Sequence, residues 1–156
     1  MIAQIILIAW ATAVAAIDAR HRRLPNWLTL GGLLGGCLYA LVTGTSLLGA
    51  NLSNALFAAA IGFLLLLPAY LAGWMGAGDV KLFAAMGMLG GGRVLLPALV
   101  IGSLVTGIMA LMLLALRKVR VPVDAPRKRP LPYGVGLAVG FALAVLDMVP
   151  ALAWKG

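Results

Sequence analysis

The sequence contains no glutamate, and its 156 residues include only four aspartates, one histidine and one cysteine. The single cysteine, Cys37, excludes an intrachain disulfide and a CxxC metal site. Charged residues make up 10% of the chain, whereas 63% of it is hydrophobic. Several apolar runs approach or exceed the ~20 residues that a transmembrane helix needs. The composition therefore predicts a polytopic integral membrane protein and not a soluble domain.

Six apolar segments predict an all-α membrane bundle of about six transmembrane helices, which forms a single domain over residues 1–156. The segments cover residues 2–17, 27–42, 52–72, 80–90, 94–116 and 133–154. The fourth segment follows a glycine-rich break and has only eleven residues, about 17 Å of helix, which is less than the ~30 Å hydrocarbon core. Either this helix continues past Gly90, or one of its ends lies inside the membrane.

The net charge of +8 does not indicate nucleic-acid binding, because the basic residues lie in short clusters between the apolar segments. Such clusters are typical of the positive-inside rule, by which the cytoplasmic loops of membrane proteins are enriched in lysine and arginine. If the loop that contains residues 20–23 is cytoplasmic, ten of the twelve basic residues lie on that side. The sequence then predicts that both termini lie outside.

Among the few acids, Asp18 and Asp79 lie at the same predicted membrane depth. A carboxylate at or near the depth of the bilayer is energetically costly, which makes it a candidate functional group. When two carboxylates share a site, one holds a proton while the other stays charged. Such a pair can activate a water and protonate a leaving amine without a metal or cofactor, which suits peptide-bond hydrolysis. The alternative is structural, with Asp18 paired to Arg22 and Asp79 paired to Lys81 or to the basic loop over residues 117–132.

Three short motifs resemble those of the type IV prepilin peptidases. The first comprises Asp18, Arg20 and Leu24-Pro25-Asn26. The second, which is similar to the GxGD motif around the second catalytic aspartate of that family, is Gly76-Ala77-Gly78-Asp79-Val80-Lys81. The third opens the last apolar segment and is Pro132-Tyr133-Gly134. The resemblance covers essentially the whole chain, and the order of the motifs fits as well.

The resemblance implies an intramembrane aspartic endopeptidase of the inner membrane, with Asp18 and Asp79 as the catalytic pair and an active site toward the cytoplasm. Its substrate would be a prepilin or pseudopilin, from which it removes the short basic leader. The family typically cuts after a glycine that precedes a hydrophobic helix. Full-size bacterial members also carry an N-methyltransferase segment. This sequence resembles the short form of the tight-adherence (Flp) pilus systems, so we expect no methylation of the new N-terminus.

The glycines and the lysine of the second motif have possible roles of their own. Gly76 and Gly78 allow a positive φ or a close backbone approach, which would admit an extended substrate beside Asp79. Lys81 either adjusts the charge of the aspartate pair, holds the substrate, or only sets the topology.

The other two motifs have alternative roles as well. Pro25 disfavours a helix that continues through Leu24, and Asn26 either hydrogen-bonds near the first aspartate or only caps the helix predicted to begin at residue 27. Pro132, Tyr133 and Gly134 either border the site or only start the last helix.

Other functions also use membrane carboxylates. A non-enzymatic assembly subunit of a pilus or secretion machine would keep the aspartates as ion pairs between helices. A proton-coupled transporter would use one as a relay, but both acids lie at one depth and no chain of polar residues crosses the apolar segments. A presenilin-type peptidase shares GxGD, but the Leu24-Pro25-Asn26 motif fits the prepilin enzymes better. We therefore expect a prepilin peptidase, with membrane lipid and the pilus assembly machinery as further partners.

Overall fold

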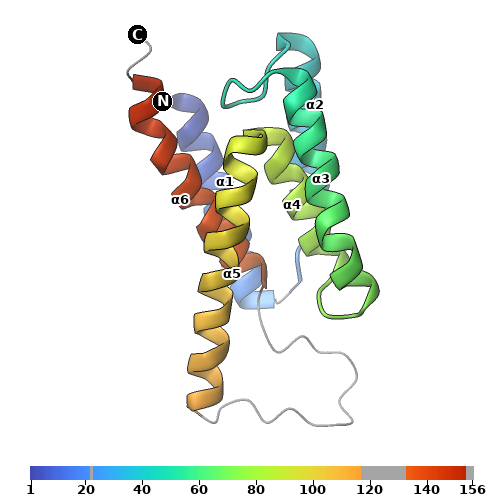
Figure 1. Ribbon diagram of the computed structural model, residues 1–156, viewed down its shortest axis with the longest axis vertical. Helices are drawn as coiled ribbons and strands as arrows, with labels where there is room; N and C mark the ends of the chain where they lie inside the picture. Colours follow the sequence, from blue (N-terminus) through green and yellow to red (C-terminus); the bar gives the residue numbers. More distant parts are fainter. Residues whose placement is uncertain (22, 117–132, 154–156) are drawn as a thin grey trace.

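The computed structural model describes residues 1–21, 23–116 and 133–153 of the chain (Figure 1). Its six helices are α1 (Ile2–His21), α2 (Asn26–Thr43), α3 (Leu52–Leu71), α4 (Ala77–Gly90), α5 (Gly92–Ala115) and α6 (Tyr133–Ala153). The predicted all-α architecture with six helices is confirmed. The start of α1 and the end of α6 lie at the same end of the bundle, in the upper part of Figure 1.

Four helices are long and apolar enough to cross a membrane, namely α1, α2, α3 and the Gly92–Met112 part of α5. The described apolar part of α6, Tyr133–Asp147, is shorter, and α4 has only 14 residues. The six predicted segments therefore exist as helices, of which four meet the requirements of a full crossing by length and composition.

The ends of α4 decide between the two alternatives for the fourth segment. The helix begins at Ala77, three residues before the predicted start, and its 14 residues span about 21 Å. It ends at Gly90 because Gly91 has a φ of 73°, a conformation that glycine adopts without steric cost. The alternative in which this helix continues past Gly90 is therefore wrong.

α4 is surrounded by protein. Its residues 82–90 are all buried, and it packs against α2, α3, α5 and α6. A helix that is apolar around its whole circumference is typical of a core position. Neighbouring helices cover α4, so it does not need the length of a membrane-crossing helix.

The helices form two groups. α6 packs against α1 and α5, which lie on the left of Figure 1, and α4 packs against α2 and α3 on the right. Contacts of α4 with α5 and α6, and of α3 with α5, join the two groups. Asp18 belongs to the first group and Asp79 to the second. A site that uses both aspartates therefore lies on the boundary between the groups.

Gly87 sets the distance between α3 and α4. A Cβ atom added at this position would lie 2.6 Å from the backbone carbonyl carbon and oxygen of Ala58, which cannot move without shifting α3. We expect Gly87→Ala to lower the free energy of unfolding by about 1–3 kcal/mol, the usual cost of overpacking a core. Thermal unfolding of the purified protein in detergent micelles measures this change.

Gly35→Ala is the matched control for Gly87→Ala. Gly35 is exposed on α2, and an added Cβ meets no atom of the described residues within 4 Å. Alanine at this position should leave the unfolding midpoint unchanged or raise it, because glycine is the poorer helix former. Equal midpoints for the two variants would show that α3 and α4 do not depend on this close contact.

Candidate active site

Asp18 lies in the last turn of α1, which extends to His21 and not only to the predicted end at residue 17. Its side chain is 2% exposed. Its Oδ2 atom accepts a hydrogen bond of 3.1 Å from the backbone N–H of Val135, in the first turn of α6. A Cβ atom added at Gly134 would lie 2.8 Å from the same oxygen. The first turn of α6 therefore closes tightly over the Asp18 carboxylate, with a glycine at the point of contact.

Asp79 lies in the first turn of α4 and is fully buried. Its Oδ2 atom accepts a hydrogen bond of 3.0 Å from the backbone N–H of Gly76, the N-cap residue. The carbonyl of Gly76 in turn accepts the N–H of Asp79 at 3.0 Å. Asp79 therefore lies within the helix, whereas the sequence predicted a helix that starts at residue 80, directly after it. The N-cap residue of this helix also orients the Asp79 carboxylate.

The two glycines of the GxGD motif differ in what they do. Gly76 has a φ of −101°, so the predicted positive φ is wrong there, and the positive φ of this connection belongs to Gly73, at 77°. Gly78 lies inside α4, where an added Cβ atom would lie 3.1 Å from the Cβ atom of Leu24. Gly78 therefore allows a close approach of Leu24 of the same protein, whereas the approach of a substrate stays a prediction.

Leu24 joins the surroundings of the two aspartates. A Cβ atom added at Gly134 would lie 3.1 Å from its Cδ1 atom, and a Cβ atom added at Gly78 would lie 3.1 Å from its Cβ atom. Gly78 directly precedes Asp79, and Gly134 contacts Asp18. The three sequence motifs therefore meet at one end of the bundle. Sequence reasoning quoted Leu24 as part of a motif but gave it no role, since no local pattern indicates a contact with two distant helices.

Both carboxylates lie at the N-terminus of a helix. The first N–H groups of a helix have no partner within it, and the aligned peptide dipoles place partial positive charge at this end. Asp79 accepts its hydrogen bond at the start of α4, and Asp18 accepts its hydrogen bond at the start of α6. These two helix starts explain how an apolar bundle holds two carboxylates in buried positions.

Lys81 and Asn26 link α4 to the start of α2. The Lys81 ammonium donates a hydrogen bond of 3.1 Å to Oδ1 of Asn26. The predicted N-cap role of Asn26 is wrong, because Pro25 is the N-cap residue, with φ −69° and ψ 140°, and Asn26 is the first helical residue. The proline ring presets this φ. The amide of Asn26 thus contacts the Asp79 motif, whereas the predictions that Lys81 adjusts charge or holds substrate stay predictions.

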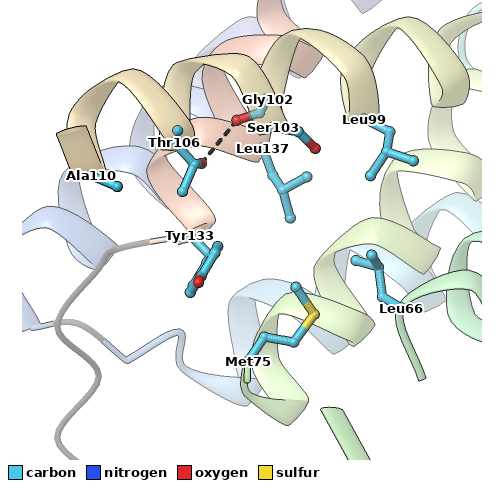
Figure 2. A pocket seen from close by; sticks show the side chains of 10 residues that line it. Leu66, Met75, Leu99, Gly102, Ser103, Thr106, Ala110, Tyr133 and Leu137 are labelled. Atoms are coloured by element: carbon cyan, nitrogen blue, oxygen red, sulfur yellow. Dashed lines mark hydrogen bonds between the residues drawn. The ribbon is translucent and has the colours of Figure 1, made fainter. Parts of the chain in front are cut away.

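A cavity of about 250 Å³ lies between α3, α5 and the start of α6 (Figure 2). It is lined by Leu66, Met75, Leu99, Gly102, Ser103, Thr106, Gly107, Ala110, Tyr133 and Leu137. Tyr133 directly precedes Gly134, and Met75 directly precedes Gly76. The cavity therefore borders both backbone segments that hold an aspartate. Sequence reasoning did not find it, because a stripe of small residues on an apolar helix equally predicts close helix packing.

The third motif is described only in part. Tyr133 lines the cavity, and Gly134 lies against the Asp18 carboxylate. Pro132, which was predicted with them, lies outside the described residues, as does the basic loop over residues 117–132.

The type IV leader peptidase family matches residues 5–111. The chain is 34% identical over 152 residues to the prepilin leader peptidase/N-methyltransferase of Pseudomonas aeruginosa, covering 90% of this chain and 48% of that protein. The protein of the same name from Aeromonas hydrophila is 34% identical over 149 residues, with coverages of 90% and 48%. The one from Dickeya chrysanthemi is 36% identical over 141 residues, with coverages of 86% and 46%.

The family match covers most of this chain, whereas the matches to individual relatives cover only part of those proteins. The chain spans about half the length of the curated relatives it matches. No solved structure matches it. The family match covers more than half of this chain and includes both Asp18 and Asp79. On this ground, the chain belongs to the type IV leader peptidase family.

Proposed function

We propose that this protein is an aspartic endopeptidase that removes the leader from a prepilin or pseudopilin. The observation that carries the proposal is the burial of two aspartates, Asp18 and Asp79, at the end of the bundle where Leu24 packs against both Gly78 and Gly134. A backbone N–H at the start of a helix holds each carboxylate. Membership of the leader peptidase family supports the reaction class, and the names of the relatives supply the type of substrate.

In the proposed reaction, one carboxylate of the pair is ionised and the other is protonated. The ionised carboxylate accepts a proton from a water molecule while the water oxygen attacks the carbonyl carbon of the scissile peptide. The protonated carboxyl group then donates its proton to the leaving nitrogen as the C–N bond breaks. The N–H groups of Gly76 and Val135 keep the carboxylates oriented through these steps.

The proposed location is the cytoplasmic face of the inner membrane. Residues 20–23, Lys81 and the basic loop lie on the side of the aspartates in the topology that the positive-inside rule predicts. The start of α1 and the end of α6 lie at the opposite end of the bundle, which agrees with both termini outside (Figure 1). A pilin of the tight-adherence (Flp) type is the proposed substrate, with lipid and the pilus assembly machinery as partners. Methylation of the new N-terminus is not part of the proposed activity.

Co-expression with a candidate prepilin tests this function. The native protein should convert the prepilin to a form that has lost the mass of its leader, which intact mass spectrometry measures. A panel of prepilins that all stay uncut beside the folded, membrane-inserted protein would overturn the proposal. Normal pilus assembly under those conditions would instead favour the non-enzymatic assembly subunit.

Metal chelators are expected to leave the cleavage rate unchanged. A pair of aspartates activates water without a metal ion. Within the described residues, no three histidine, cysteine or acidic side chains lie together in a way that could hold one. Cleavage by the purified protein in detergent, measured with and without EDTA or 1,10-phenanthroline, checks this expectation. Inhibition that added zinc reverses would indicate a metallopeptidase.

A further inference from the structure

We propose that the cavity between α3, α5 and α6 is a specificity pocket, which receives apolar side chains of the substrate from the segment that follows the scissile bond. This inference rests on the proposed peptidase function and adds which part of the substrate the protein recognises. Leu66, Met75, Ser103, Gly107 and Tyr133 are the residues through which the pocket would act.

The position of the cavity connects it to the aspartates. Tyr133 and Met75, each one residue from a segment that holds a carboxylate, form part of its wall. Figure 2 shows Tyr133 and Ala110 toward one end of the cavity and Leu66 and Leu99 toward the other. The lining residues of α5 run from Leu99 to Ala110, about 16 Å along the helix axis. A peptide cut beside the aspartates can therefore extend along this wall toward the middle of the bundle.

The chemistry of the wall selects the segment that enters. None of the described residues that line the cavity carries a charge. The Thr106 hydroxyl donates a hydrogen bond of 2.8 Å to the carbonyl of Gly102 (Figure 2), so its proton is already used within α5. A basic leader would be costly in such a place, since a buried charge needs a partner. An apolar segment carries no charge that would need a partner there. In the proposed substrate, such a segment follows the scissile bond.

The size of the cavity fits side chains. An apolar cavity of ~150 Å³ is large enough to hold benzene, so about 250 Å³ accommodates an aromatic or a branched aliphatic side chain. The space exists because α5 presents small residues here, among them Ser103 and Gly107. Both are exposed, and a Cβ atom added at Gly107 meets no described atom within 4 Å. The cavity is therefore accessible from outside the bundle beside α5.

Two filling variants test the pocket with synthetic prepilin peptides. Each apolar residue in the first two helical turns after the cut is replaced by alanine, one at a time, and kcat/KM is measured in detergent. With the native protein, kcat/KM should fall about tenfold or more for the alanine peptide at one or more of these positions, as expected for a side chain that fills an apolar pocket. Gly107→Leu, which adds a leucine side chain at a residue that lines the cavity, should reduce that loss at the same positions to less than about twofold. Ser103→Leu, one turn earlier on the same wall, should do the same.

Gly35→Leu is the matched control, because it adds the same side chain at an exposed position of α2 that does not line the cavity. Its alanine profile should equal that of the native protein. A role in folding alone would lower kcat/KM for all peptides together and leave the profile unchanged. A flat profile in the native protein, or an unaltered profile in both filling variants, would overturn the pocket and leave the peptidase intact. A native protein that cuts no peptide would instead overturn the proposed function.

Discussion

Asp18→Asn and Asp79→Asn are each expected to slow leader cleavage by at least ~10²–10⁴-fold, the contribution of a positioned general acid or base. An asparagine amide has nearly the shape of a carboxylate, and its oxygen can still accept the N–H of Val135 or of Gly76. It cannot take a proton from water, however. The loss should therefore be chemical, with a protein that still folds and inserts into the membrane.

Co-expression with prepilin measures this loss as the uncut fraction, and thermal unfolding in detergent reports on the fold. Asp147→Asn is the matched control, because Asp147 is exposed and lies in the second half of α6, whose first turn holds Asp18. This variant should process prepilin at the native rate. Normal prepilin processing by Asp18→Asn or by Asp79→Asn would contradict the proposed mechanism. If processing stayed normal while stability or pilus assembly fell, the acids would act as structural pairs of an assembly subunit.

The helices could be predicted more easily than their ends. An apolar run shows where a chain prefers lipid or a core, but helical hydrogen bonds continue until a residue interrupts them. α1 therefore continues through Asp18 to His21, although its apolar run stops at residue 17. At the other motif, the glycines before Asp79 indicate a break, yet α4 already begins at Ala77. In both cases an aspartate that was expected beside a helix lies within one.

The placement of both acids at one end of the bundle could be predicted, whereas the atoms that hold them could not. Six alternating segments place Asp18 and Asp79 at the same end of the bundle, whatever the helix packing. The hydrogen bond between Asp18 and Val135 joins residues 117 positions apart and depends on how α1 packs against α6. The contacts of Leu24 with Gly78 and Gly134 depend on packing in the same way. Tertiary packing, and not local pattern, determines these details and the cavity beside them.

Gly134→Ala is expected to reduce cleavage by about a hundredfold, the effect of displacing a catalytic group by ~1 Å. The added carbon would lie 2.8 Å from Oδ2 of Asp18, 2.9 Å from its Cγ and 3.1 Å from Cδ1 of Leu24. The neighbouring N–H of Val135 holds the same carboxylate oxygen, so the strain cannot be relieved by moving α6 away without losing that hydrogen bond. The Asp18 carboxylate or the start of α6 must shift. The measurement is kcat for a prepilin peptide, with the unfolding midpoint recorded alongside.

A second variant separates the two groups that the new methyl group would crowd. Leu24→Ala combined with Gly134→Ala removes the contact with the leucine but leaves the contact with the carboxylate. Cleavage should stay low in this double variant, because Asp18 is still displaced. Gly31→Ala is the control for an added methyl group, since a Cβ atom there meets no described atom within 4 Å, and it should cleave at the native rate. Recovery of the native rate by the double variant would show that Leu24 had transmitted the effect. A native rate in Gly134→Ala itself would contradict the tight closure of α6 over Asp18.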